Sequence, residues 1–348
     1  HQAAFHDRIQ SKPHGWGSES CLPVQTSVVT WHSVREGAPI SLPSSRIAPA
    51  FDFAISADAK WLALVGSGAA GWAIDIGSTD PAAVAWDPSC ISQGGPAGVM
   101  APVDDLPGAP TAVAFAADGL AWVQLREPAL LLAIDPVTLE REAEIVLSDV
   151  SVADSGHELF HRATSSRIAC ASCHPEGRED GVTWRVDDEP RRSQALSIGM
   201  AGSEPFHWHG EMADLTQIAD EIHGERMCGE RLSAEQTDAL TRYVFGLRAM
   251  KPRTDDADAI ARGAEVFVRA GCVTCHAGER YTNDLTVLVG QEMLQVPSLR
   301  AASFRAPLMH DGRSATVRDA VIDMLALGPA LFLSDAELDD LVAFVAAL

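Results

Sequence analysis

Two five-residue strings hold the residues best suited to chemistry in this chain. Each reads Cys-x-x-Cys-His, with Cys170, Cys173 and His174 in the first string and Cys272, Cys275 and His276 in the second. Two thiols three positions apart on a helical turn can reach both vinyl groups of a haem, while the adjacent imidazole points at the iron. A zinc knuckle needs about four ligands at a closed site, and a redox dithiol needs no histidine after it. The strings therefore predict two covalently attached c-type haems.

The sixth position on each iron decides what each haem does, because a filled position favours electron transfer and an open one admits peroxide or oxygen. The methionine candidates for the second haem are Met293, Met309 and Met324. Laying this part of the chain on itself at an offset of 101 to 102 residues places Ile222 opposite Met324, and isoleucine cannot bind a metal. A thioether ligand raises the reduction potential. The pair His276 and Met324 therefore predicts an electron-storing second haem.

The first haem then lacks that ligand. The polar residues that flank Ile222 are expected to line its distal side instead. Glu221, His223 and Glu225 are each able to move a proton during cleavage of an O–O bond. The alternative is that these side chains simply face water, as charged residues on a helix usually do. If His223 instead binds the first iron, both haems are six-coordinate and the protein is a plain electron carrier.

The first 150 residues, which precede these strings, are expected to form a β-rich domain. Two stretches match at a spacing of 60 residues, Phe53–Ile76 and Val113–Pro136, and each alternates apolar residues around an Ala-Asp turn. This pattern predicts repeated antiparallel hairpins, as in propeller blades. Two or three blades cannot close a ring of about four to eight. The alternatives are a partial propeller, one completed by a second copy or another chain, and a small sandwich. The segment Gly77–Pro110 is expected to be a surface loop.

The remaining chain is expected to be mainly α-helical and duplicated. The same offset brings His209-Gly210 onto Asp311-Gly312, and it aligns two closing helices that begin with capping boxes. These boxes pair Ser233 with Gln236 and Ser334 with Glu337. The predicted fold is therefore multidomain, with a boundary near residues 148–155. Its parts are an all-β domain over 1–150 and two cytochrome c domains over 151–250 and 251–348.

Residues 156–348 resemble the bacterial di-haem cytochrome c peroxidases, a family that includes the MauG-type enzymes that oxidise residues of a partner protein. The resemblance is carried by the haem strings, by Pro190-Arg191-Arg192 with Phe206–Gly210, and by Val296–Arg300 with Ala306–Arg313. It implies a peroxidatic first haem that receives electrons from the second haem through a tryptophan, which Trp208 matches. It also implies Met324 as an iron ligand, at the family's distance after His310. His310 itself is expected to take part in binding the haem, and a calcium ion is expected between the haem domains.

Two departures from the family's pattern concern the reaction site. The family has Trp-Asp-Gly where this chain has Trp208-His209-Gly210, and an ungapped count places the family's catalytic glutamate on Cys228. Glu225 is the nearest substitute, with Glu221 as the other candidate. If neither reaches the iron, peroxidase activity is not expected.

The leading hypothesis is an enzyme that reduces hydrogen peroxide with electrons from a small donor protein, either a cytochrome c or a cupredoxin. A second version oxidises a partner protein or an organic substrate, as MauG-type enzymes do. A third hypothesis treats the β-rich segment as a protein-binding module. Its binding face would consist of the four tryptophans Trp61, Trp72, Trp86 and Trp122.

Composition restricts the partners and the compartment. The net charge of −22, from 48 acidic and 26 basic residues, argues against nucleic acid or an anionic membrane as a partner. No apolar run of about 18 residues predicts a membrane span, and no leader precedes His1, so the processed form is expected. Covalent haem attachment predicts a periplasmic or otherwise extracytoplasmic location. There Cys21 and Cys90 could form a disulfide, with Cys228 left over.

Overall fold

The computed structural model describes most of the chain from residue 47 onward and short pieces before it. The described residues are 2–4, 9, 16, 25–31, 40–44, 47–68, 71–79, 100–103, 106–254, 256–328 and 332–348. The chain divides into two compact units. The sheet unit holds His1–Ser172 and Ala219–Leu240, and the repeat unit holds Cys173–Ile218 and Thr241–Leu348. The division falls inside the first haem string, between Ser172 and Cys173.

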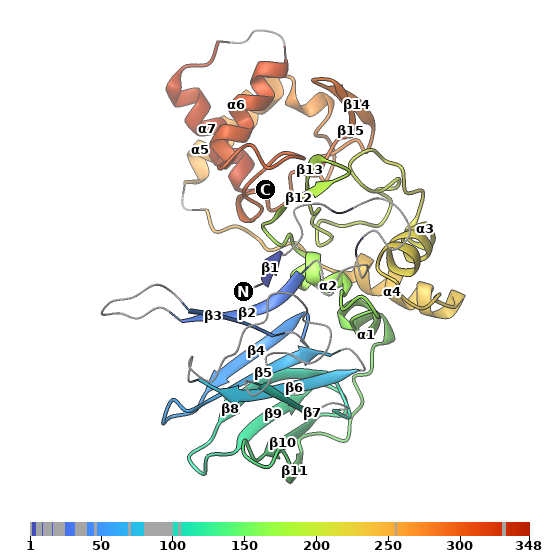
Figure 1. Cartoon of the computed structure of the whole chain (residues 1–348). Helices are drawn as coiled ribbons and strands as arrows, with labels where there is room; N and C mark the ends of the chain where they lie inside the picture. Colours follow the sequence, from blue (N-terminus) through green and yellow to red (C-terminus); the bar gives the residue numbers. More distant parts are fainter. Residues whose placement is uncertain are drawn as a thin grey trace. The chain divides into compact units, whose positions relative to one another are not determined.

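The described residues of the sheet unit form three antiparallel sheets whose strands follow one another in sequence order (Figure 1). The first is β1 (Gln2–Ala4), β2 (Gln25–Trp31) and β3 (Ile40–Ser44). The second is β4 (Ala50–Ile55), β5 (Trp61–Ser67), β6 (Trp72–Ser78) and β7 (Met100–Val103). The third is β8 (Pro110–Phe115), β9 (Ala121–Leu125), β10 (Leu130–Ile134) and β11 (Arg141–Val146). The structure therefore confirms the β-rich character expected for the first 150 residues.

The 60-residue repeat corresponds to these two four-stranded sheets, because β4–β6 and β8–β10 occupy the matching stretches. The turn aspartates have the expected place: Asp118 accepts a hydrogen bond from the backbone of Leu120, and Asp58 accepts one from Ser56. The hydrogen bond from Ser56 is the main reason that the pKa of Asp58 falls to about 2. One expectation is wrong in part: Met100–Val103, inside the predicted surface loop, pairs with β6 as strand β7.

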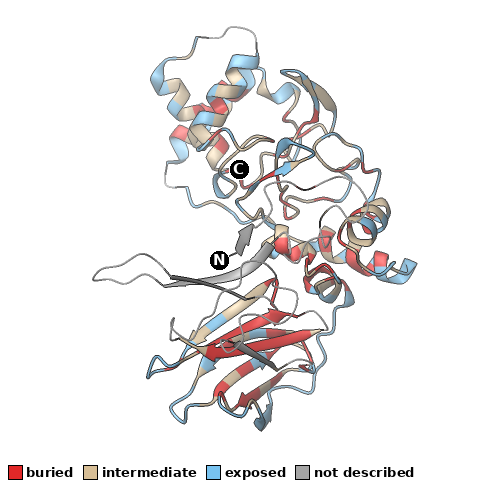
Figure 2. Ribbon diagram, viewed as in Figure 1, coloured by how far each residue is buried: buried red, intermediate tan, exposed pale blue. Residues whose placement is uncertain are grey.

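The two four-stranded sheets share one apolar core, which appears as the buried strands of Figure 2. It includes Ile74 and Ile76 from β6 and Leu132 and Ile134 from β10, all at most 2% exposed. Trp72 is buried in this core and Trp61 packs against it, as tryptophans on strands usually do. Trp86 lies outside the described residues. Closure into a propeller stays a prediction.

Helix α1 (Ser155–His161) follows the predicted boundary and is fixed at both ends. The side chain of Asp154 accepts hydrogen bonds from two backbone N–H groups of the first turn. At the other end, the ring of His161 stacks on His157 with centroids 4.1 Å apart and meets Phe51 edge-on. Burial, followed by the nearby charge of His161, lowers the pKa of His157 to about 4.

The second part of the sheet unit centres on a π-helix, η4 (Ile218–Arg226), which continues from the short helix α3 (Leu215–Gln217). Two side-chain hydrogen bonds tie the residues after it to the segment before the first haem string: Thr164 donates to the Met227 carbonyl, and Ser165 donates to the Cys228 carbonyl. The predicted capping box at Ser233 is confirmed at the start of α4 (Ala234–Gly246).

The repeat unit shows the predicted duplication in its local structure. Each half has a hairpin, β12 (Thr183–Val186) with β13 (Glu189–Arg192) and β14 (Thr286–Val289) with β15 (Glu292–Gln295). Each hairpin is followed by a closed turn, bridged at Phe206 and Met212 in one half and at Leu308 and Ser314 in the other. The hairpins are β structure within a part predicted as mainly helical. The predicted domain boundaries at 150 and 250 stay a prediction.

Three helices and a short 3-10 turn also belong to the described part of the second half. They are α5 (Ala257–Arg269), η6 (Ala302–Phe304), α6 (Val317–Leu327) and α7 (Asp335–Ala346). Their apolar faces meet in one core, which contains Phe267, Val321 and Leu341. The capping box predicted at Ser334 is confirmed, and Thr316 with Asp319 forms another at α6.

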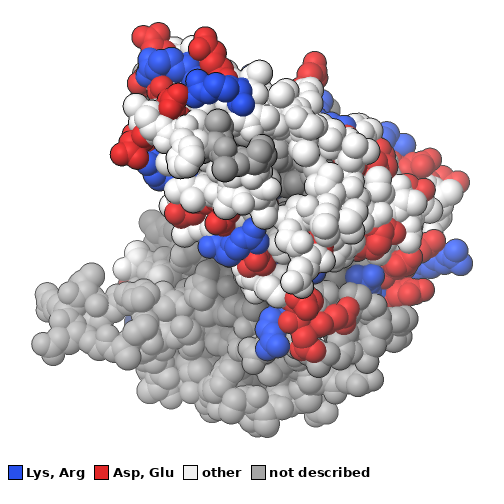
Figure 3. All heavy atoms as spheres, turned by 90° about the horizontal axis from the view of Figure 1, so that it is seen from above, with Lys and Arg blue, Asp and Glu red and all other residues white. Residues whose placement is uncertain are grey.

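The surface carries closely interspersed charges. On the face seen in Figure 3, acidic and basic side chains lie next to one another, and ion pairs such as Arg262–Asp340 and Arg318–Asp339 join the helices of the second half. None of the helices in the described part of the chain has the length and apolar character that a membrane crossing requires.

Candidate haem sites and the contact between the repeats

The first haem string forms a single helical turn. Helix α2 (Cys170–Cys173) has one thiol at each end, so both sulfurs lie on the same turn, as attachment to two vinyl groups requires. Burial raises the pKa of the Cys170 thiol to about 11. At neutral pH this sulfur is therefore a protonated thiol, which is inert toward oxidation compared with a thiolate.

The imidazole of His174 follows directly after this turn, where the 3-10 helix η3 (Pro175–Gly177) begins. Its Nδ1 atom is buried and has no hydrogen-bond partner. Burial lowers the pKa of His174, and the Asp180 carboxylate only partly opposes this effect. A neutral imidazole is the form that binds iron.

In the second haem string, the orientation of the histidine ring is set by a hydrogen bond. Gly271, at a φ of 77°, turns the chain from α5 into η5 (Cys272–Thr274), and the backbone N–H of His276 donates to the Cys272 carbonyl. The side chain of His276 is buried, and its Nδ1 lies 3.1 Å from the backbone oxygen of Tyr281. With Nδ1–H donating to that oxygen, Nε2 presents its lone pair. A backbone carbonyl orients metal-binding histidines in this way.

The two sixth-ligand positions differ in structure as well as in residue type. Met324 lies on the α-helix α6 with 40% of its surface exposed, so its sulfur is not sealed in the apolar core. Ile222 lies on the π-helix η4 and is buried. Of the other methionines considered, Met293 is 52% exposed on β15, and Met309 occupies the turn before His310 at a φ of 71°. The role of Met324 stays a prediction.

The predicted acid–base residues are spread around η4. Glu225 is exposed, whereas Glu221 lies 3.9 Å from the guanidinium of Arg226. His223 is half-buried, its Nδ1 is buried without a hydrogen-bond partner, and burial lowers its pKa. His223 is thus the most enclosed of the three candidates, while Glu225 is the most accessible to water.

Trp208 and His310 lie at equivalent places in the two repeats, and they touch each other. Their rings meet edge to face with centroids 6.2 Å apart. Two equivalent backbone hydrogen bonds cross between the repeats. The N–H of Arg192 donates to the His310 carbonyl, and the N–H of Gln295 donates to the Trp208 carbonyl. Each hairpin thus ends on the turn of the other repeat.

The Trp208 indole is held by a hydrogen bond from Nε1 to the Arg192 carbonyl, 2.8 Å long. On the other side, Nε2 of His310 lies 3.5 Å from a Glu292 carboxylate oxygen, whose partner oxygen accepts from Arg191 at 2.6 Å. Burial lowers the pKa of His310, so its ring is neutral at neutral pH. Sequence reasoning missed Glu292, because nothing in the spacing connects β15 with β13.

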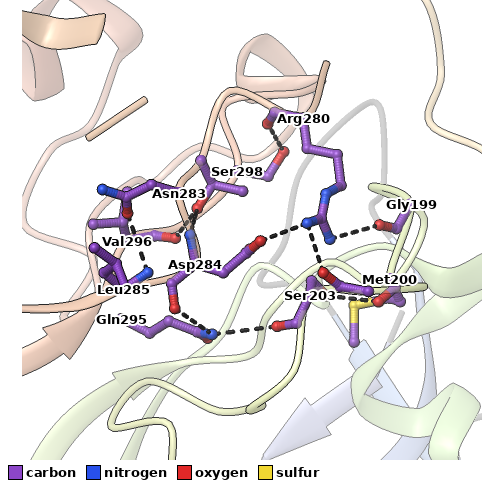
Figure 4. A network of polar contacts seen from close by, with 12 residues as sticks. Gly199, Met200, Ser203, Arg280, Asn283, Asp284, Leu285, Gln295, Val296 and Ser298 are labelled. Carbon is purple, nitrogen blue, oxygen red and sulfur yellow. Dashed lines mark hydrogen bonds and ion pairs between the residues drawn. The ribbon is translucent and has the colours of Figure 1, made fainter. Parts of the chain in front are cut away.

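A second polar network joins the segment of residues 199–203 to the segment of residues 280–295 (Figure 4). The guanidinium of Arg280 donates to the backbone carbonyls of Gly199 and Gly202 and pairs with Asp284. The amide of Gln295 donates to the carbonyl of Ser203. Among the described residues, no group of three or more His, Cys, Asp or Glu side chains could hold a metal ion. The calcium prediction therefore gains no ligand set.

Comparison with known proteins shows what this chain is similar to. No protein-family model matches it. Methylamine utilization protein MauG of Methylorubrum extorquens is 26% identical over 272 residues, which cover 56% of this chain and 76% of that protein. The chain is similar to the MauG-type di-haem cytochrome c peroxidases. This similarity supports a haem-dependent oxidoreductase that carries c-type haems.

Two solved structures are also similar to this chain. Hydrazine synthase of Kuenenia stuttgartiensis has 19% sequence identity and a TM-score of 0.48, over 56% of this chain and 86% of that one. A MauG-like protein associated with microbial copper homeostasis has 17% identity and a TM-score of 0.45, over 59% and 91%.

Proposed function

We propose that this protein reduces hydrogen peroxide at the iron bound by His174, with electrons that enter at the iron bound by His276. One peroxide molecule takes up two electrons and two protons and leaves as two water molecules. The observation that carries the proposal is the contact between Trp208 and His310 at the junction of the two repeats. A side chain at that junction is suited to relay electrons between two haem-bearing halves.

Haem iron supplies the redox chemistry when it is bound. The protein's own residues hold and tune it: His276 is oriented by the Tyr281 carbonyl, and Met324 would raise the reduction potential of the second site. Trp208 is held in one orientation by its hydrogen bond to Arg192. The neutral ring of His310 packs on its edge without adding a charge.

Proton delivery to the peroxide is assigned to the residues of η4. Glu225 is exposed and can exchange protons with water, whereas His223 is the more enclosed group. Glu221 is the second carboxylate candidate, held near Arg226. A proton donor placed at the reacting oxygen contributes about 100-fold to 10,000-fold to the rate.

The electron donor is proposed to be a small redox protein, a cytochrome c or a cupredoxin, in the periplasm. The alternative within the same chemistry takes the electrons from a protein or organic substrate, and likeness to MauG supports that version. The two versions differ in the reductant and share the path through Trp208.

The test replaces Trp208 with phenylalanine, which keeps the apolar ring but removes the Nε1 hydrogen bond. Half-reduced protein is mixed with peroxide in a stopped-flow spectrometer, and oxidation of the second haem is followed. The variant should bind both haems but oxidise the second one more slowly. Trp122→Phe in the sheet unit is the matched control and should behave like the unsubstituted protein. An unchanged rate in Trp208→Phe would remove this residue as the relay.

A second candidate function, a plain electron carrier, is favoured by the environment of His223. A half-buried imidazole with an unpartnered Nδ1 suits a second iron ligand as well as a proton donor. EPR spectra of the oxidised and half-reduced protein separate the two functions. A high-spin ferric signal from one haem supports the peroxidase, and two low-spin signals in both states support the carrier.

A further inference from the structure

The repeat unit buries two guanidinium groups around one carboxylate. Arg192 donates to one oxygen of Glu179 at 3.1 Å, and Arg305 donates to the other at 2.7 Å. The side chains are 1%, 10% and 7% exposed for Arg192, Arg305 and Glu179. Glu179 is the only carboxylate paired with either arginine among the residues that the structure describes. The cluster therefore carries an excess positive charge in a buried place.

The hydrogen bonds of Arg192 are also incomplete. Its Nη2 atom binds Glu179, but Nε and Nη1 are buried and have no hydrogen-bond partner. Leaving a buried donor unpaired costs about 1–3 kcal/mol, and more when the group is charged. Arg305, by contrast, uses a second nitrogen, Nη1, on the backbone oxygens of Ser298 and Arg300. The unpaired hydrogen-bond donors of the cluster therefore belong to Arg192.

At the equivalent place in the second repeat stands Gln295, whose side-chain donors have hydrogen-bond partners. Gln295 ends hairpin β14–β15 as Arg192 ends hairpin β12–β13, and both donate their backbone N–H groups to the other repeat's turn. The Gln295 side chain is neutral, and its amide donates to the carbonyls of Ser203 and Pro205. The first repeat instead has a cation with two unpaired donors, so an anion would suit that place and not the equivalent place in the second repeat.

The chemistry that meets this demand is a carboxylate enclosed in the protein. Charged N–H donors and carboxylates form the strongest hydrogen bonds of this kind. The hairpin that carries Arg192 follows the first haem string, and Glu179 lies five residues after His174. Each attached haem brings propionate carboxylates with it. We propose that Arg192 binds a propionate of a covalently attached haem, which rests on the proposed attachment at the two strings.

The experiment measures the reduction potentials of both haems by spectroelectrochemistry in three charge variants. Arg192→Met removes a positive charge near the propionate, and Glu179→Gln removes the negative charge beside it. A unit charge about 10 Å from an iron, at an effective dielectric constant of about 20, changes its redox equilibrium about tenfold. That equals about 59 mV for a one-electron couple. Arg262→Met, which breaks an exposed ion pair on α5, is the control.

The expected result is a lower potential of one haem in Arg192→Met, a higher potential of the same haem in Glu179→Gln, and no change in Arg262→Met. The haem that responds is the one whose propionate is bound. The resonance Raman band of the propionate bending mode should shift for that haem only. A shift of that band in Arg192→Lys, which keeps the charge, would show the loss of donors.

Potentials and propionate bands that stay unchanged for both haems in Arg192→Met would overturn the proposal. Changes of equal sign in Arg192→Met and Glu179→Gln would also do so, because they indicate general loosening of the fold. Haem content by mass spectrometry reports attachment separately, and peroxide turnover does not enter the result. Failure of the peroxidase function is therefore distinguishable from failure of this inference.

Discussion

Replacing Gly263 with alanine should destabilise the second repeat by about 2 kcal/mol. Gly263 lies in α5 where this helix packs on α7. A Cβ atom there would be 2.0 Å from the backbone oxygen of Asp340 and 2.7 Å from Cβ of Phe344. Both obstacles belong to or adjoin the backbone of α7. No side-chain rotation can therefore make room.

The magnitude follows from two opposing effects. Ordinary contact begins at 3.4 Å, so the helices must separate by about 1.4 Å at this point. Overpacking a core typically costs about 1–3 kcal/mol, and a backbone obstacle belongs at the upper end of that range. Alanine recovers about 1 kcal/mol because it favours helix more than glycine does. The separation would also loosen the core of Phe267 and Leu341, against which Cys272 packs.

The assay is urea unfolding of the protein with haem attached, followed by the absorbance of the second haem. Gly246→Ala is the matched control, since Gly246 ends helix α4 and a Cβ there meets nothing within 4 Å. The midpoint should fall in Gly263→Ala and stay or rise slightly in Gly246→Ala. If Gly263→Ala unfolds at the same or a higher urea concentration, the close helix contact and the reasoning from it are refuted.

Three further predictions concern the haem sites and pH. Met324→Ala should lower the potential of the second haem and open it to small ligands in visible spectra; an unchanged potential removes Met324 as a ligand. Glu225→Gln should slow peroxide turnover with haem content intact, and full activity would move the role to Glu221 or His223. Burial holds the pKa of His157 near 4 in the folded chain, against an ordinary value of 6.5. The unfolded chain therefore binds the proton first, and stability should fall as pH drops from about 6.5 to about 4. His157→Gln should weaken this dependence in urea midpoints at pH 7 and 5, and an equal dependence in both proteins argues against it.

Local patterns in the sequence were enough to predict the elements that bear the chemistry. The haem strings, the capping boxes at Ser233 and Ser334 and the 60-residue repeat depend on residues close together in the chain, so their spacing predicts them. The duplicated turns were found in the same way. Both turns proved to need a left-handed residue, His207 at a φ of 69° and Met309 at 71°, which their side chains do not signal.

Contacts between distant segments could not be predicted. Strand β7 returns to β6 after more than twenty residues, and Met100–Val103 has no alternation that marks a strand. The burial of Arg192 and Arg305 was hidden because arginine is usually exposed. The two arginines share Glu179 only after both hairpins and turns have folded together. The only sign of this cluster in the sequence was the pair Arg191-Arg192, at the end of strand β13.

The π-helix η4 records how the two repeats have diverged. The caps at Asp214 and Thr316 are 102 positions apart, whereas the caps at Ser233 and Ser334 are 101 apart. The first repeat therefore contains one inserted residue between its caps, and a π-helix accommodates such an insertion because each turn takes in more chain. Counted forward from the first pair of caps, Met324 matches Ile222, whereas counted back from the second pair it matches His223. Deletion of one residue from η4 should therefore restore an α-helix.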